Sequence, residues 1–186
     1  LHAAADKPSA REIGTRRLLD ALEDREMPDV VLLVLDRVQQ DEDVSAELKQ
    51  EVSFRRAEAL AATGRKEGNA ARRNEIYDRA TKELDAFLKA VPEGEKAIDA
   101  YLQKGNLLIA RGRAKLEQAG RQGEDAKKLR AEALPFFEAA IQTLDGPKRE
   151  PTDEIGAVAN AEDAVLKQLR GVDAALKELR GDGGDK

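Results

Sequence analysis

The side chains that most often do chemistry in proteins are nearly absent from this sequence. Its only histidine is His2, and it contains no cysteine. A Ser-His-Asp triad needs a histidine that the fold holds in place, and zinc sites combine several histidine, cysteine or carboxylate ligands. We therefore expect no histidine-based catalysis, no thiolate nucleophile, no disulfide and no metal site.

Carboxylates are abundant, but none lies in a catalytic pattern. A pair of catalytic carboxylates needs a pocket that shifts their pKa values, and nothing in the sequence indicates one. Asp41 to Asp43 lacks the glycine and the terminal glutamate of a calcium loop. Gly120 to Gly123, GRQG, lacks the Lys-Ser/Thr ending of a phosphate-binding loop. The sequence predicts neither an enzyme nor a cofactor.

The distribution of charge and apolar residues argues against nucleic acid and against a membrane span. The chain has 32 Lys and Arg, 37 Asp and Glu, and a net charge of −5, with the two signs interspersed. Nucleic-acid-binding domains are usually basic. The longest apolar run, Val30 to Leu35, is far shorter than the roughly 18 residues that cross a bilayer. We expect no nucleic-acid partner and no transmembrane segment.

The elements that must position any site are helices. Ala, Leu, Glu, Lys and Arg dominate, and aromatic residues make up 3%, as is typical of long amphipathic helices. Ser9 stands three residues before Glu12, the spacing of a capping box, and Ser45 can cap a later helix. Pro28 suits a first helical turn. Breaker residues separate the remaining segments, at 68–69, 92–94, 120–123 and 146–151. The pattern predicts about seven helices and no strands.

Two stretches are ambiguous. Val30 to Leu35 could form a buried strand, but its charged flanks and the length to Gln40 favour a helix. Pro135 lies within the helix that contains Leu129 and Phe137. We expect it to kink or split that helix, because proline lacks the amide donor.

Two of the expected helices share a pattern of small and large residues. The first copy comprises Ala80, Leu84, Phe87, Leu88 and Pro92, and the second comprises Ala133, Phe137, Ala140 and Ile141. This pattern resembles the second helix of the tetratricopeptide repeat, a two-helix unit of about 34 residues. The segment KGNLLIARG, Lys104 to Gly112, resembles the first helix of that unit, in which a glycine permits close helix approach.

The spacing within the pairs departs from the family. Ala80 follows Gly64 by 16 residues and Ala133 follows Gly112 by 21, whereas the family has a short interval. The intervening residues are strong helix formers with glycine-marked turns. We infer that both helices of these pairs are lengthened and that the hairpins protrude beyond a normal repeat.

The resemblance implies an all-α fold in which antiparallel hairpins stack as a right-handed, TPR-like α-solenoid of about seven helices. The expected units are 9–41, 45–92 and 94–147, after a disordered lead-in at 1–8. A helix at 152–180 would cap or continue the array, and 181–186 would be a disordered tail. Its seam alternates by four and three, and it could dock on the preceding helices or pair with a second copy. The seam residues are Val165, Leu169, Val172, Leu176 and Leu179.

The resemblance also implies a function, since first helices of such arrays line a concave face that binds peptides or partner helices. By alignment, the residues on that face are Glu12, Thr15, Glu51, Phe54, Glu58, Asp99, Leu102 and Asn106. This mixed apolar and acidic face would suit a protein or peptide partner with basic and hydrophobic groups. We expect a non-catalytic scaffold for protein–protein interactions. The alternatives are a structural self-association module that uses the seam helix, and a regulatory domain of an enzyme.

The cellular context is inferred from the first residues and from a second similarity. The start, LHAAAD, is compatible with a removed signal peptide. Extended hairpins are similar to those of repeat-rich bacterial envelope proteins. We therefore expect a fragment of a longer bacterial protein, and a periplasmic or exported location is favoured over a cytoplasmic one.

Overall fold

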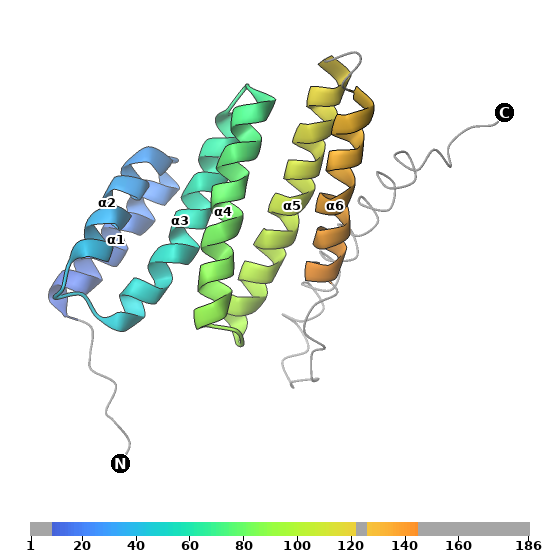
Figure 1. Cartoon of the computed structure of the whole chain (residues 1–186). Coiled ribbons are helices and arrows are strands. Elements are labelled where there is room, and N and C mark those ends of the chain that lie inside the picture. The colour runs from blue at the N-terminus through green and yellow to red at the C-terminus, as the bar shows by residue number, and fades with distance from the viewer. Residues whose placement is uncertain (1–8, 122–125, 145–186) are drawn as a thin grey trace.

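The computed structural model is all-helical in the residues that the structure describes, 9–121 and 126–144 (Figure 1). This part contains six α-helices and no strand. They are α1 (Ala10–Asp24), α2 (Pro28–Gln40), α3 (Ala46–Lys66), α4 (Ala70–Ala90), α5 (Glu95–Arg121) and α6 (Ala126–Leu144). The expected lead-in at 1–8, the seventh helix at 152–180 and the tail at 181–186 lie outside the described residues.

The helix starts follow the caps expected from the sequence. The Ser9 hydroxyl accepts a hydrogen bond from the Glu12 amide at 3.2 Å, and the Glu12 carboxylate accepts one from the Ser9 amide, which completes a capping box. Ser45 caps α3, and Asn69 caps α4 by accepting from two amides. Pro28 occupies the first turn of α2. These contacts satisfy amides that have no partner within their helices.

Both ambiguous stretches are helical. The run Val30 to Leu35 lies within α2, and Val31 and Leu35 are fully buried. Pro135 lies inside α6, which continues without interruption from Ala126 to Leu144. Of the expected kink or split, the split is therefore wrong. Ala133 and Phe137, on either side of the proline, are fully buried, and this tertiary packing compensates for the lost backbone hydrogen bond.

The later helices are longer than the first two. Helices α1 and α2 have 15 and 13 residues, whereas α3, α4, α5 and α6 have 21, 21, 27 and 19. The hairpins α3–α4 and α5–α6 therefore extend beyond the α1–α2 hairpin (Figure 1). The long intervals from Gly64 to Ala80 and from Gly112 to Ala133 are taken up by this added helix.

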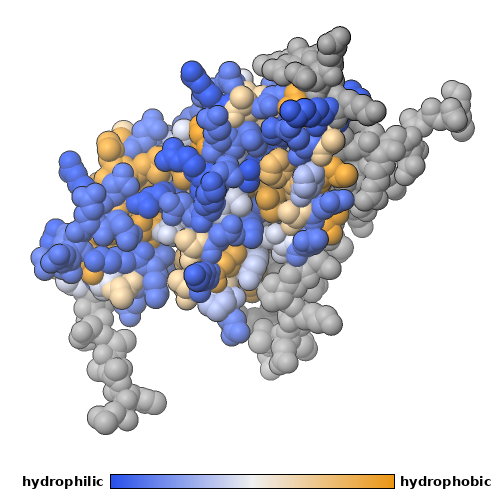
Figure 2. All heavy atoms as spheres, viewed as in Figure 1, coloured by the Kyte–Doolittle hydropathy of each residue, from blue (hydrophilic) through white to orange (hydrophobic). Residues whose placement is uncertain are grey.

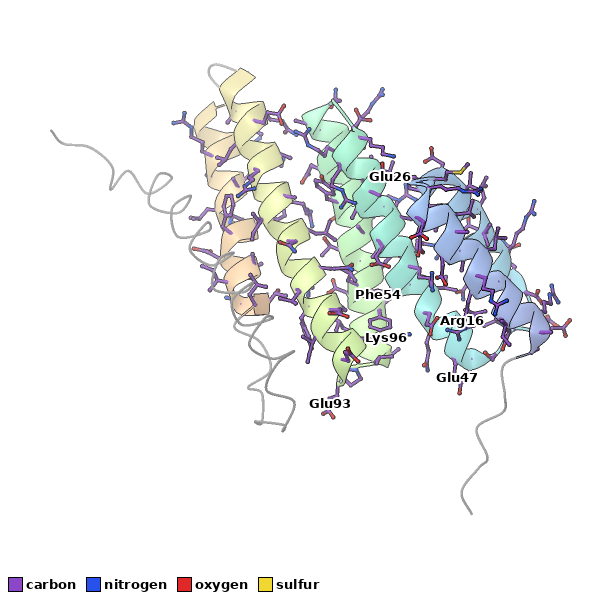
Figure 3. The ribbon with its side chains drawn as sticks, turned by 180° about the vertical axis from the view of Figure 1, so that it is seen from behind. Arg16, Glu26, Glu47, Phe54, Glu93 and Lys96 are labelled. Atoms are coloured by element: carbon purple, nitrogen blue, oxygen red, sulfur yellow. The ribbon has the colours of Figure 1, made fainter. Side chains whose placement is uncertain are left out.

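Each helix packs against the next one in the chain. Helices α1, α3 and α5 form one layer and α2, α4 and α6 the other (Figures 1 and 3). Ion pairs also join helices within the first layer, because Arg16 of α1 and Lys96 of α5 both bind Glu51 of α3. Local hairpins and these lateral contacts together hold the row of helices.

Three apolar clusters follow one another along the row. The N-terminal core joins α1, α2 and α3 and includes Leu19, Val31, Leu35 and Val52. The central core joins α3, α4 and α5 and includes Leu60, Tyr77, Leu84, Phe87 and Leu107. The C-terminal core joins α5 and α6 and includes Leu108, Ile109, Ala133, Phe137 and Ala140. No single core spans the described part of the molecule.

The second layer presents a mostly hydrophilic surface. Figure 2 shows hydrophilic side chains over most of this face, with hydrophobic patches over the α1–α2 hairpin and over α6. Leu33 of α2 is 64% exposed. It lies two residues from both Val31 and Leu35, which are fully buried, and so it faces away from the core.

Candidate partner-binding surface

Two grooves of the first layer flank α3, one on each side. The larger groove lies between α3 and α5 and has a volume of about 310 Å³. The side chains of α3 and α5 form its walls, and Tyr77 of α4 contributes to its lining. The lining residues are Glu58, Ala61, Arg65, Tyr77, Gln103, Asn106, Leu107 and Ala110.

The smaller groove lies between α3 and the turn that joins α1 to α2. Its volume is about 180 Å³, and its lining includes Met27 from that turn and Pro28, the first residue of α2. Glu58 and Arg65 line both grooves. These two residues are seven positions apart, or about two helical turns. They therefore lie in one row along α3, and this row forms the ridge between the two grooves.

Glu58 is the carboxylate common to both grooves. Burial raises its pKa, and the negative charges of Glu23 and Asp99 raise it further. A hydrogen bond from Gln103 Nε2 to Glu58 Oε1, at 2.9 Å, opposes this shift, as does the charge of Arg55. The groove therefore contains a carboxyl group that a bound cationic group would stabilise in its charged form.

Glu51, two turns before Glu58 on α3, has the opposite environment. Burial alone would raise its pKa, but hydrogen bonds from Arg16 and Lys96 outweigh that effect and lower the pKa. The Lys96 ammonium lies 2.7 Å from Glu51 Oε1. Figure 3 shows Arg16 and Lys96 on the same side of the molecule, on helices that flank α3. Glu51 is thus a bridging residue of the layer.

Arg55 is a second bridge between α3 and α1. It donates to Asp20 at 2.8 Å and to both carboxylate oxygens of Glu23, at 2.9 and 3.1 Å. Burial alone would lower the pKa of Arg55, but the two carboxylates raise it above its ordinary value. Because Arg55 pairs with the acids of α1, it does not form an ion pair with Glu58. Glu58 therefore has no direct basic partner among the described residues.

The structure brings five of the residues expected on the concave face to the α3–α5 side of the layer. Glu58 and Asn106 line the larger groove, and Glu51 forms the lateral bridge. Asp99 is exposed on α5, and its charge acts on Glu58. Phe54 is half-buried, and its ring centroid lies 5.2 Å from that of Phe87 in the central core. Phe54 therefore contributes packing as well as surface (Figure 3).

The remaining three expected residues have different surroundings. Glu12 is 6% exposed, and its carboxylate accepts hydrogen bonds from the Ser45 and Ser9 amides, at 2.6 and 3.3 Å. These bonds, above all the one from Ser45, lower its pKa. The Thr15 hydroxyl donates to the Arg11 carbonyl. Leu102 is half-buried on α5 and does not line either groove.

Several lining residues were not identified from the sequence. Gln103 approaches Glu58 across the gap between α3 and α5, and Tyr77 reaches the groove from a second-layer helix. Arg65 lies in the last turn of α3. The contact between the Tyr77 ring and Gly64 could not be predicted from the sequence, because it depends on the lengths of both α3 and α4. The only sign of this close contact in the sequence was Gly64 itself.

This arrangement is suited to binding. The side chains that line the larger groove carry one carboxyl group, one guanidinium, two amides and the Tyr77 hydroxyl, and its apolar lining residues are Leu107, Ala61 and Ala110. Within residues 9–121 and 126–144, no group of three His, Asp or Glu side chains could hold a metal ion. No described helix is long and apolar enough to cross a membrane.

Comparisons with known proteins gave no match. A scan against protein-family models, a search of curated proteins and a search of solved structures each found none.

Proposed function

We propose that the chain is a non-catalytic, TPR-like helical-repeat scaffold that binds a protein or peptide partner along the first layer. The observation that supports this most is the pair of grooves that flank α3 and share Glu58 and Arg65. Three successive helix pairs contribute to them. Helical repeats bind through such extended surfaces.

The lining suggests the chemistry of the partner. Glu58 is half-buried among like charges, and Asp99 is exposed nearby. A lysine or arginine side chain from a partner would relieve this repulsion. Leu107, Ala61 and Ala110 offer apolar contact beside it. We propose that the partner is an extended segment or helix that carries basic and hydrophobic side chains.

The test is selection of binding peptides from an unbiased displayed library, with the full chain immobilised. The affinity of the selected peptides is then measured in solution for the wild type and for two variants. Glu58→Lys reverses a charge of the larger groove, and Asn106→Arg changes its wall. We expect each variant to weaken binding by roughly tenfold or more, because a buried charge contact and its shape are both lost.

The matched controls lie outside both grooves. Glu75→Lys makes the same charge change on exposed α4 surface, and Gln39→Arg adds the same side chain on exposed α2 surface. Both should bind the peptides as the wild type does. The proposal fails if no peptide is selected, or if the groove variants and the controls bind equally well.

A further inference from the structure

Helix α2 exposes a leucine in the middle of its outer side. Leu33 is 64% exposed, more than any other large apolar side chain of the described residues. The other exposed ones lie in the same hairpin or its turn, and they are Ile13, Leu18 and Met27. The hydrophobic patch over this hairpin is visible in Figure 2. A single exposed leucine is common on protein surfaces, so the side chains around Leu33 must show whether it has a partner.

Two opposite charges flank Leu33 on the same side of α2. Asp29 precedes it by four residues and Arg37 follows it by four, so the three side chains form one row along the helix. Both charged side chains are exposed, and neither pairs with another residue of the described part of the chain. By contrast, the Asp36 carboxylate is held by Arg56 of α3 at 2.9 Å. The charges of this row are therefore available to another molecule.

The ends of the helix explain only part of this arrangement. Asp29 lies in the first turn of α2 and Arg37 in the last turn, where the helix dipole favours an acid and a base respectively. The dipole accounts for each charge separately. It does not account for a strongly exposed leucine at the midpoint between them.

The surface beside Leu33 is apolar as well. Val30 lies three residues before Leu33 and seven before Arg37, so it borders the row. It is half-buried, as is Val34 one turn after it. The centre of this surface is therefore apolar, and its two ends carry opposite charges.

This pattern is complementary to itself when it is reversed. If two copies of α2 lie antiparallel about a two-fold axis at Leu33, the two leucines meet at the axis and contact the bordering valines. Asp29 of each copy then lies opposite Arg37 of the other, because both are four residues from the axis. A two-fold contact requires such a self-complementary surface. Rows of residues spaced by four are also the ridges along which helices most often pack.

We propose that the chain forms a homodimer in which the outer sides of α2 from two copies pack antiparallel, with Leu33 at the two-fold axis. The contact is centred on one helix from each copy and is small, so we expect a weak dimer. Both grooves belong to the first layer, whereas α2 lies in the second layer (Figure 1). This inference therefore does not rest on the proposed function.

The test is sedimentation equilibrium of the full chain at concentrations up to roughly 1 mM, where weak contacts of this class are populated. The wild type should dimerise. Asp29→Arg and Arg37→Asp, each made alone, should weaken dimerisation by roughly tenfold or more, because each places like charges opposite each other at two symmetric sites. The double variant, Asp29→Arg with Arg37→Asp, exchanges the two charges and should restore the dimer. A role in the helix dipole alone would make the double variant worse than either single one.

The matched controls change the same charges at equivalent ends of other helices. Glu47 is an exposed acid in the first turn of α3, and Lys89 is an exposed base in the last turn of α4. Glu47→Arg and Lys89→Asp should dimerise as the wild type does. Circular dichroism of every variant checks that the helices are retained.

A cysteine cross-link tests the position of the axis independently of charge. The chain has no cysteine, so Leu33→Cys introduces a single one. This variant should form a disulfide-linked dimer under mild oxidation, because residues at a two-fold axis lie within reach of their own copies. Gln39→Cys, at an exposed position on another side of α2, should not.

Four outcomes would overturn the proposal. The first is a wild type that stays monomeric up to roughly 1 mM, at which a weak contact would be populated. The second is a double variant that does not recover, and the third is equal cross-linking of Leu33→Cys and Gln39→Cys. The fourth is a dimer that none of the α2 variants weakens, which would assign the contact to another surface, such as the seam helix expected at 152–180.

Discussion

Glu51 and Glu58 lie two turns apart on the same side of α3, but their carboxyl groups have opposite environments. Arg16 and Lys96 bind Glu51 and lower its pKa, although burial opposes this. Glu58 has a single amide donor, Gln103, and burial raises its pKa. One helix thus carries a carboxylate held by two basic side chains and a carboxylate without a direct basic partner among the described residues.

The two glutamates should therefore give opposite pH profiles. A carboxyl group with a raised folded-state pKa destabilises the protein once it is charged, and this penalty is absent below the ordinary pKa. Glu58→Gln should then raise the urea midpoint at about pH 7 and leave it unchanged at about pH 3.5, below the unperturbed pKa of glutamate.

Glu51→Gln should have the reverse effect. The lowered pKa of Glu51 means that it stabilises the fold above its ordinary pKa, and that this stability disappears as the pH falls through the folded-state pKa. Its variant should have a lower urea midpoint near pH 7 and converge on the wild type in acid. Parallel profiles for the two variants would contradict the assignment of these environments.

Arg111 links α4, α5 and α6 at a single side chain. Its guanidinium lies 2.8 Å from Asp78 and 4.3 Å above the Phe136 ring. Burial lowers the pKa of Arg111, and Asp78 offsets part of this effect. We expect Arg111→Met to lose about 1–2 kcal/mol of unfolding free energy, as measured by denaturant titration, because both contacts disappear. Arg113→Met, at an exposed position on the same helix, should lose much less.

At the scale of helices, three glycines set how closely the pairs pack. Gly64 is covered by the Tyr77 ring, Gly105 by Leu144 and Gly112 by Phe137. A glycine inside a helix costs roughly 0.5–1 kcal/mol relative to alanine, so its retention at a contact has a packing reason. Gly14 in α1 has no heavy atom within 4 Å of an added Cβ, and packing does not require a glycine there.

The same substitution should consequently have opposite signs at two positions. Gly112→Ala places a methyl group against the Phe137 ring, and overpacking of this kind costs roughly 1–3 kcal/mol. Gly14→Ala should stabilise the protein by about 0.5–1 kcal/mol, because α1 gains helix propensity without a clash. Thermal unfolding of both variants checks this, and destabilisation by Gly14→Ala would refute it.

At the scale of the molecule, stability is divided among three successive cores. The N-terminal and central cores both use α3, and the central and C-terminal cores both use α5. In such a row, each unit interacts mainly with its neighbours, so local opening can occur without global unfolding. Of these three cores, α1 contributes to the N-terminal one, whereas Leu32 of α2 also packs against the central core.

Two leucine truncations should distinguish these regions. Leu19 and Leu84 are both fully buried, and Leu→Ala at such positions costs roughly 2–5 kcal/mol. Leu19→Ala should speed hydrogen exchange in α1 and α2 and leave α5 and α6 protected. Leu84→Ala should speed exchange in α3, α4 and α5 together. Equal acceleration throughout by both variants would show one cooperative unit instead.

The sequence alone determined the helical class, the starts of α1 to α4 and the added length of the later pairs. Those features depend on local signals, namely caps, prolines, glycines and apolar periodicity, which act within a few residues. Pro135 was the exception, since local chemistry predicted a kink or a split, and α6 is not split there because its buried neighbours keep the helix continuous.

Only the tertiary structure decided the environment of the candidate surface. Arg16 and Glu51 are 35 residues apart, and Gln103 and Glu58 are 45 apart. Such pairs depend on how neighbouring helices are rotated and offset, which no local pattern specifies. For this reason the sequence placed Glu12 and Glu58 on the same expected face, whereas the structure buries Glu12 at a helix cap and leaves Glu58 in a groove.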